Sequence, residues 1–198
     1  MRIDPIEVYT FDELSAKAKE HALENERTSD CLHIHYDYDY YKELLNEYGF
    51  LGPTIYWTGF WSQGDGACFE IKGFDVLTYL TKTKQKTKYK KIINQLNKEN
   101  LELVGTIHRN QFGHHYEHAN SRYFELETLD YEDVIFRLSL QELIDDLEKN
   151  IERQRYDLSN QIYRSLEKDY EAQTSDEYLS EHLTVNQVEY RNDGRLHH

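Results

Sequence analysis

The sequence predicts an α+β fold, with a mostly antiparallel sheet of two hairpins, helices packed on one face of it, and a long acidic C-terminal helix. Two pairs of strand-like runs occupy residues 54–72 and 103–128. Apolar residues recur at helical spacing over about 30 residues from Ser139. Because the 198 residues contain no low-complexity linker, we expect one domain over residues 1–198, in which residues 137–198 form a helical part that could be an appendage.

The first 50 residues are expected to hold a strand and two helices. Residues 6–11 alternate as a short strand. Thr10 and Glu13 have the spacing of a capping box, which predicts a helix that runs to about Arg27. Tyrosines and a leucine that recur every four residues predict a second helix over residues 36–48.

The middle of the chain combines the two hairpins with shorter helices. We expect strands at 54–61 and 67–72, a short helix at 74–80, a helix at 82–100, and strands at 103–109 and 116–128. On the helix at 82–100, Lys82, Lys86 and Lys90 would align, as would Lys84, Lys88 and Lys91.

The C-terminal third is expected to be helical. Ser139 and Glu142 have the pattern of a capping box at the start of the long helix, whose apolar stripe is interrupted at Gln154 and Arg155. Thr174 is expected to cap a final helix that runs to about Val185, before a strand-like run and a turn.

The composition favours a folded protein with an acidic surface. Hydrophobic content is 38%, but 17 tyrosines supply large rings that can fill a core. The net charge of −14 disfavours direct binding of nucleic acid. Cys31 and Cys68 fit a reducing compartment, and neither a signal-peptide core nor a membrane-spanning apolar run occurs. We therefore expect a cytoplasmic protein with no membrane partner.

The stretch Ser62-Gln63-Gly64-Asp65-Gly66 is the first candidate site. Two glycines around an aspartate allow positive φ and can expose backbone N–H groups to an anion or a partner. Asp-Gly between apolar runs is also a strong hairpin signal, and we favour that interpretation. Trp57 and Trp61 flank the turn and could add an aromatic binding surface, although packing in the core is the favoured interpretation for these aromatic residues.

A histidine-rich stretch is the second candidate. His108, His114 and His118, with Glu117 nearby, are residue types that bind zinc or another divalent metal. Their spacing does not fix a tetrahedral geometry, so a polar hairpin tip without a cofactor is the favoured alternative.

Two charged stretches are further candidates. The lysines of residues 82–91 could bind an acidic partner, nucleic acid in the manner of an antitoxin, or the protein's own acidic face, although a solvated helix face is the favoured interpretation. The acidic stretch "LIDDLEKNIE" could imitate the phosphate spacing of DNA, or could serve solubility alone.

Four segments together resemble a widespread family of uncharacterised proteins from tailed bacteriophages and prophages, some of which carry an antitoxin-like label. These segments are "VYTFDELSAKAKEHA", "IYWTGFWSQGDGACFE", "GHHYEH" and "NQVEYRNDGRL". The matching positions are Phe11 to Leu14, Phe60, Ser62 to Phe69, Gly113, His114, Tyr116 and His118. The chain departs from the family pattern at Trp57, at His115 and in its lysines.

The resemblance implies a phage origin and an accessory role in the infected host. With the acidic charge, it favours a non-catalytic protein that binds and modulates a basic host or defence protein. A metal-dependent enzyme or small-ligand binder that uses the histidines is the alternative, and a nucleic-acid binder that uses the lysines is a second one.

Overall fold

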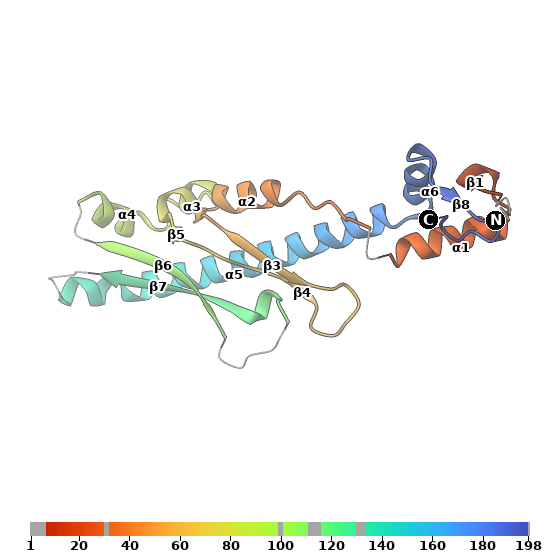
Figure 1. Cartoon of the computed structure of the whole chain (residues 1–198). Coiled ribbons are helices and arrows are strands. Elements are labelled where there is room, and N and C mark those ends of the chain that lie inside the picture. The colour runs from red at the N-terminus through yellow and green to blue at the C-terminus, as the bar shows by residue number, and fades with distance from the viewer. Residues whose placement is uncertain (1–6, 30–31, 99–100, 111–115, 130–133, 198) are drawn as a thin grey trace. The chain divides into compact units, whose positions relative to one another are not determined.

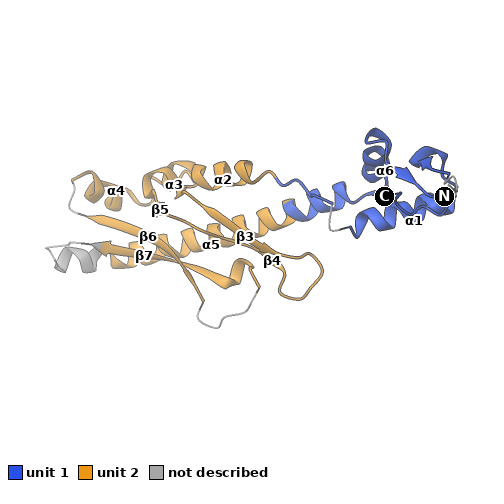
Figure 2. Ribbon diagram, in the orientation of Figure 1, with its two compact units in different colours: residues 1–36, 166–198 blue, residues 37–165 orange. Residues whose placement is uncertain are grey.

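The computed structural model describes residues 7–29, 32–98, 101–110, 116–129 and 134–197. The chain forms two compact units (Figure 2). Unit 1 contains residues 1–36 and 166–198, and unit 2 contains residues 37–165. Helices and antiparallel strands occur together, which confirms the predicted α+β class.

Unit 1 joins elements from the two ends of the sequence (Figure 1). Its elements are β1 (Tyr9–Thr10), the 3-10 turn η1 (Phe11–Glu13), α1 (Ala16–Arg27), α6 (Asp176–Val185) and β8 (Glu189–Tyr190). The strands β1 and β8 pair antiparallel, with Tyr9 opposite Tyr190. A small core forms beneath them from Phe11, Leu14, Ala18, Ala22, Leu183 and Tyr190.

The helix starts in unit 1 differ from the predicted ones by short distances. The capping box of Thr10 and Glu13 is present, but it caps η1 rather than α1. Helix α1 begins after Ser15, whose side chain accepts a hydrogen bond from the Ala18 N–H. Ser175, and not the predicted Thr174, caps α6, because its hydroxyl accepts from the Tyr178 N–H.

Unit 2 contains both predicted hairpins. Its elements are α2 (Tyr38–Glu47), β2 (Phe50–Leu51), β3 (Thr54–Thr58), β4 (Gly66–Glu70), β5 (Gly73–Phe74), α3 (Val76–Lys82), α4 (Lys90–Asn97), β6 (Glu102–Arg109), the 3-10 turn η2 (Ala119–Ser121), β7 (Arg122–Leu129) and most of α5 (Val134–Gln173). The pairs β3–β4 and β6–β7 are antiparallel, and so is the β2–β5 pair.

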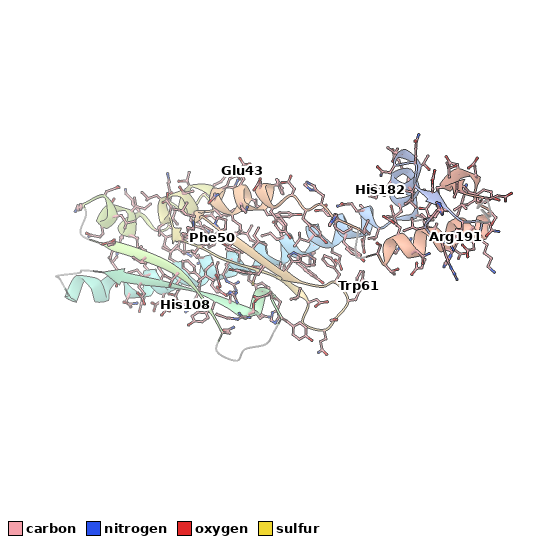
Figure 3. The ribbon with its side chains drawn as sticks, in the orientation of Figure 1. Glu43, Phe50, Trp61, His108, His182 and Arg191 are labelled. Atoms are coloured by element: carbon pink, nitrogen blue, oxygen red, sulfur yellow. The ribbon has the colours of Figure 1, made fainter. Side chains whose placement is uncertain are left out.

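Four phenylalanine rings form the centre of the core of unit 2. Phe50 contacts Phe69 and Phe74 with ring centroids 5.2 Å apart in each pair, and Phe74 contacts Phe124 at 4.9 Å. These rings come from β2, β4, β5 and β7, so the core joins the three small sheets of the unit. Phe50 is labelled in Figure 3.

The helix predicted over residues 82–100 is only partly present, because its helical part in the structure is α4 (Lys90–Asn97) and not one continuous helix. Helix α3 ends at Lys82, α4 begins only at Lys90, and Lys84 between them has a φ of +58°. The Lys84 N–H donates to the Thr81 carbonyl and the Gln85 N–H to the Leu80 carbonyl, which is the Schellman pattern of a helix end. The expected alignment of lysines along one helix therefore does not form.

The start of the long helix also differs from the prediction. Helix α5 runs for 40 residues from Val134, so Ser139 lies inside it and does not cap it. The apolar residues before Ser139 continue the helical spacing, which explains the earlier start.

Helix α5 covers the open edge of β7. The Phe124 N–H donates to Glu152 Oε2 at 2.8 Å, and the Leu126 N–H donates to Glu148 Oε2 at 2.8 Å. Figure 1 shows the β6–β7 hairpin running beside α5. Two carboxylates thus satisfy backbone donors that a third strand would otherwise use.

Candidate functional site

The loop between β3 and β4, residues 59–65, is held in shape by its own aspartate. Asp65 Oδ2 accepts hydrogen bonds from the Trp61 N–H at 2.9 Å and the Ser62 N–H at 2.6 Å. The Asp65 N–H in turn donates to the Ser62 carbonyl at 3.1 Å. The predicted hairpin connection is therefore confirmed, and the N–H groups of Trp61 and Ser62 are satisfied inside the loop.

The aromatic residues of this loop divide into buried and exposed ones. Phe60 is buried and stacks on Trp57 with ring centroids 5.0 Å apart. The Trp57 indole N–H donates to the Tyr38 hydroxyl at 2.9 Å. Trp61, in contrast, is 76% exposed on the same loop (Figure 3). Trp57 and Phe60 thus anchor the loop, and Trp61 extends from it.

Gly64 in the loop and Gly66 at the start of β4 allow the segment 116–118 to lie close to the loop. Gly64 has a φ of +101°, and a Cβ at this position would lie 3.1 Å from the Tyr116 ring. A Cβ on Gly66 would lie 2.5 Å from Cβ of His118, so only glycine allows this approach. Tyr116 is itself 42% exposed. The exposed residues Trp61, Ser62, Gln63 and Tyr116 are called the Trp61 patch below.

The predicted binding residues therefore have different roles. Trp61, Ser62 and Gln63 are exposed. Asp65 shapes the loop, and Trp57, Gly64 and Gly66 allow its packing.

A buried ion-pair network, which the sequence patterns did not predict, lies next to the loop. The Arg122 side chain is 2% exposed, and its Nη2 lies 3.1 Å from Glu70 Oε1 and 3.2 Å from Glu117 Oε2. Its guanidinium also lies over the Tyr56 ring, 5.4 Å from the centroid. The alternation along β7 could have revealed this residue, because Arg122 shares the buried face with Phe124 and Leu126.

Cys68 belongs to the same network as a protonated thiol. Its Sγ donates to Glu117 Oε2 at 3.1 Å. Burial, as the main cause, raises the pKa of the Cys68 thiol to about 12. Because the thiolate is the nucleophilic form, this residue acts as a packed core group and not as a reactive one.

The predicted metal ligands have separate partners where the structure describes them. His108 Nε2 lies 2.7 Å from Thr106 Oγ1 and 3.2 Å from Glu125 Oε2. His118 Nδ1 accepts from the Asn120 N–H at 3.0 Å and thereby caps η2. His114 lies outside the described residues. Within those residues, no three His, Cys, Asp or Glu side chains are grouped closely enough to hold a metal.

The charged stretches are partly used within the chain. Lys82 pairs with Glu47, and Lys88 Nζ lies 2.6 Å from Asp146 Oδ2. Glu148 and Glu152 bind β7, as described above. The stretch "LIDDLEKNIE" thus does not present an unbroken row of carboxylates, and the remaining exposed lysines, Lys84, Lys86, Lys90 and Lys91, follow a turn and a short helix.

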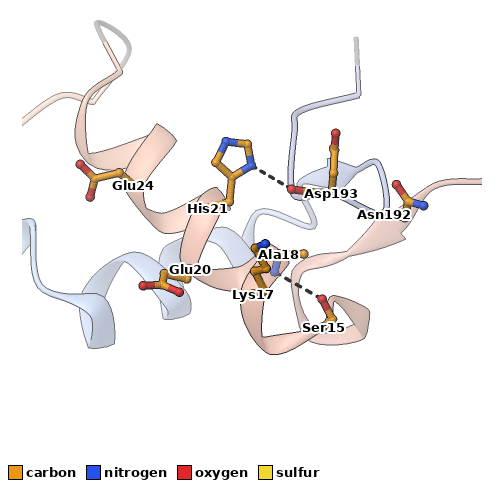
Figure 4. Close-up of a pocket in the computed structure, with 8 residues that line it drawn as sticks. All are labelled: Ser15, Lys17, Ala18, Glu20, His21, Glu24, Asn192 and Asp193. Atoms are coloured by element: carbon orange, nitrogen blue, oxygen red, sulfur yellow. Dashed lines mark hydrogen bonds between the residues drawn. The ribbon is translucent and has the colours of Figure 1, made fainter.

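An open groove of about 550 Å³ lies in unit 1 between α1 and the turn after β8 (Figure 4). His21 Nδ1 lies 2.8 Å from the Asp193 carbonyl oxygen across it, and Gly194 approaches the Ala18 backbone. Its charged lining is mixed, with Lys17 beside Glu20 and Glu24. This groove mainly marks where the C-terminal turn packs on α1.

Comparison with known proteins places the chain in a family. The family described as "Domain of unknown function (DUF8835)" matches residues 33–176, and the chain belongs to it. No curated protein and no solved structure matches the chain. Among the described residues, no helix is both long enough and apolar enough to cross a membrane.

Proposed function

We propose that this chain is a non-catalytic accessory protein that binds and modulates another protein through the Trp61 patch. The observation that carries the proposal is the 76% exposure of Trp61 on a loop fixed by Asp65, Trp57 and Phe60. A large aromatic side chain is costly to leave in water, and tryptophan is among the residues most enriched at the centres of protein interfaces. A fixed loop also loses little conformational entropy on binding.

Charge favours a basic partner. Unit 2, which carries the Trp61 patch, contains 21 acidic and 16 basic residues, so its net charge is −5 within the total of −14. A basic protein would be attracted by this field, and the attraction would weaken with added salt. The resemblance to tailed-phage proteins suggests that the partner is a host or defence protein.

A hydrolase or transferase built on Cys68 is less well supported, because its thiol is buried and protonated. The metal-dependent alternative depends on His114, which lies outside the described residues. The proposed binding role, in contrast, depends on Trp61 and the residues that hold its loop, all of which the structure describes.

The test compares Trp61→Ala with Tyr40→Ala, a control at another exposed aromatic residue of unit 2. Partners captured by the natural protein from host lysate are identified, purified and titrated by calorimetry at low and high salt. We expect Trp61→Ala to weaken binding about 30-fold, equivalent to ~2 kcal/mol, and Tyr40→Ala to leave it within about twofold. Equal affinity for both variants and the natural protein would rule out the Trp61 patch as the interface.

A further inference from the structure

A small pocket in unit 1 contains a carboxylate that has no close cation among the residues that the structure describes. The pocket has a volume of about 120 Å³ and lies between the end of α1, the segment 32–34 and helix α6. Its lining combines Leu32 and Ile34 with the polar side chains of Glu26, His33, Gln173, Tyr178 and His182. One water molecule occupies ~30 Å³ in the liquid, so the pocket has room for a small head group.

Glu26 is the charged residue of this pocket. Its side chain is only 16% exposed, and among the described residues its ion-pair partner is His182, whose Nδ1 lies 4.0 Å from Glu26 Oε1. That distance is beyond hydrogen-bond range. The Tyr190 hydroxyl is also buried and has no hydrogen-bond partner among the described residues. Burial, and then the charge of Glu26, raises the pKa of Tyr190 to about 12.

The neighbouring arginine does not neutralise Glu26. Arg27 Nε donates to the Thr174 carbonyl at 3.1 Å, and its two terminal nitrogens bind Glu24 and Asp176. Burying a carboxylate without a cation costs free energy, so a cationic group in the pocket would be stabilised.

The aromatic lining favours a flat cation. The rings of Tyr178 and His182 are nearly parallel, with an angle of 8° between their planes and 6.3 Å between their centroids. Guanidinium is planar, is weakly hydrated and stacks on aromatic faces, whereas ammonium is a compact and strongly hydrated charge. Figure 3 places His182 on α6.

We propose that this pocket binds a guanidinium group, which pairs with the Glu26 carboxylate and stacks on the Tyr178 and His182 rings. The group could belong to an arginine side chain of a protein or to a free guanidino compound. The segment 32–36 is fixed beside the pocket, because Gln173 exchanges two hydrogen bonds of 2.8 Å with the backbone of His35. This inference does not depend on the Trp61 patch.

The test titrates the full chain, labelled with 15N, with Nα-acetyl-arginine methylamide at pH 8, where free histidine is neutral. The neutral citrulline counterpart and the lysine counterpart are titrated in parallel, and agmatine represents a free guanidino compound. We expect saturable shifts of unit 1 amides with a Kd on the order of 1 mM for the arginine probe. The citrulline probe should bind at least about tenfold more weakly, and the lysine probe several-fold more weakly.

Variants locate the binding in this pocket. Glu26→Gln should weaken the arginine probe at least about tenfold, whereas Glu20→Gln, an equal charge change on an exposed residue of the same helix, should not. Tyr178→Leu, at a 43% exposed side chain, should weaken it about threefold. Trp61→Ala should have no effect, so this test and that of the proposed function fail separately.

Three results would overturn the proposal: no saturable shift at ~20 mM probe, equal binding of arginine and citrulline probes, or equal losses in Glu26→Gln and Glu20→Gln. Circular dichroism of each variant checks that it is folded, and Tyr178→Leu keeps the test decisive should Glu26→Gln fail to fold. Tighter binding of agmatine than of blocked arginine would support a free compound as the source, and the reverse would support a protein.

Discussion

Asp65 determines the shape of the β3–β4 loop, because one carboxylate oxygen accepts two backbone N–H groups. Asp65→Ala would leave both donors to water at a partly exposed site. We expect a loss of about 1 kcal/mol in the free energy of unfolding and weaker partner binding, since Trp61 would no longer be held. Urea unfolding and calorimetry measure these effects, with Asp157→Ala, at an exposed aspartate of α5 outside the Trp61 patch, as the control. The role assigned to Asp65 is wrong if stability and binding are both unchanged.

Lys84 and Gln187 are the two described residues other than glycine with a positive φ, +58° and +50°. Both end a helix in the position where glycine is usual. Because a Cβ is strained in this conformation, we expect Lys84→Gly and Gln187→Gly each to stabilise the protein by about 1 kcal/mol in thermal unfolding. Lys149→Gly, at an exposed position in the interior of α5, should instead destabilise it by ~1 kcal/mol. Destabilisation by the first two substitutions would contradict this explanation.

At the scale of elements, side chains of α5 can reach successive N–H groups of β7, because four residues of a helix and two residues of a strand span similar distances. Residues four apart on a helix are separated by about 6 Å, and residues two apart on a strand by about 6.8 Å. Glu148 and Glu152 can therefore reach the Leu126 and Phe124 N–H groups together. The carboxylates also block this edge against the addition of another strand.

The two carboxylates should contribute unequally. Glu152 also pairs with Arg155, which is fully buried, whereas Glu148 binds the strand alone. Removal of Glu152 would leave a buried guanidinium with one fewer partner. We expect Glu152→Ala to cost ~3–5 kcal/mol and Glu148→Ala ~1 kcal/mol in urea unfolding. Similar losses in both variants would show that the buried pair is not the dominant interaction.

Local patterns predicted the elements that depend on local interactions. Both hairpins and the helix at 36–48 follow from apolar periodicity and turn residues. The structure has them near the expected bounds, except that β3 ends at Thr58 and not at 61, and β7 begins only at Arg122, after η2, and not at 116. The prediction of one helix over 82–100 failed because lysine is compatible with both a helix and a turn. The hydrogen bonds around Lys84 show that the chain forms a turn there. The alternation along β7 places Arg122 on the buried face, but its carboxylate partners come from other segments, and one sequence does not show which segments meet.

For the candidate site, the sequence predicted the loop but not the roles within it. Two tryptophans flank the turn, and the sequence does not distinguish them. In the structure, Trp57 donates a hydrogen bond to Tyr38 and stacks on Phe60, whereas Trp61 is exposed. The pocket around Glu26 was not foreseen at all. Its walls come from residues about 140 positions apart, so no local pattern marks it.

At the scale of the whole molecule, unit 1 is built from the two ends of the described chain. Antiparallel pairing of β1 with β8 and packing of α1 on α6 join segments that lie far apart in the sequence. Most of unit 1 lies outside residues 33–176, the part matched by the family. It contains 16 acidic and 7 basic residues, a net charge of −9, which would favour cationic ligands in its pocket.

A buried cysteine thiol and buried tyrosine hydroxyls make the stability of both units sensitive to high pH. Burial raises the pKa of Cys68 and Tyr190, each to about 12, and also that of Tyr79. In the unfolded chain these groups ionise near pH 8.5 for the thiol and near pH 10 for the phenols. Above those values the unfolded state holds fewer protons than the folded state, so rising pH favours unfolding. The stability contributed by the protonated groups is fully present below about pH 8.5 and is lost progressively up to about pH 12.

We therefore expect the urea midpoint to be constant from pH 7 to about 8.5 and then to fall steadily. Tyrosine absorbance near 295 nm, followed in the same samples, should show that the buried phenols ionise only as the fold is lost. Tyr190→Phe removes one of these groups together with a hydroxyl that lacks a partner among the described residues, so this variant should be at least as stable at pH 7 and lose less stability at pH 11. A midpoint that stays level to pH 11 would mean that these side chains reach solvent in the folded protein, which their burial in the two cores does not allow.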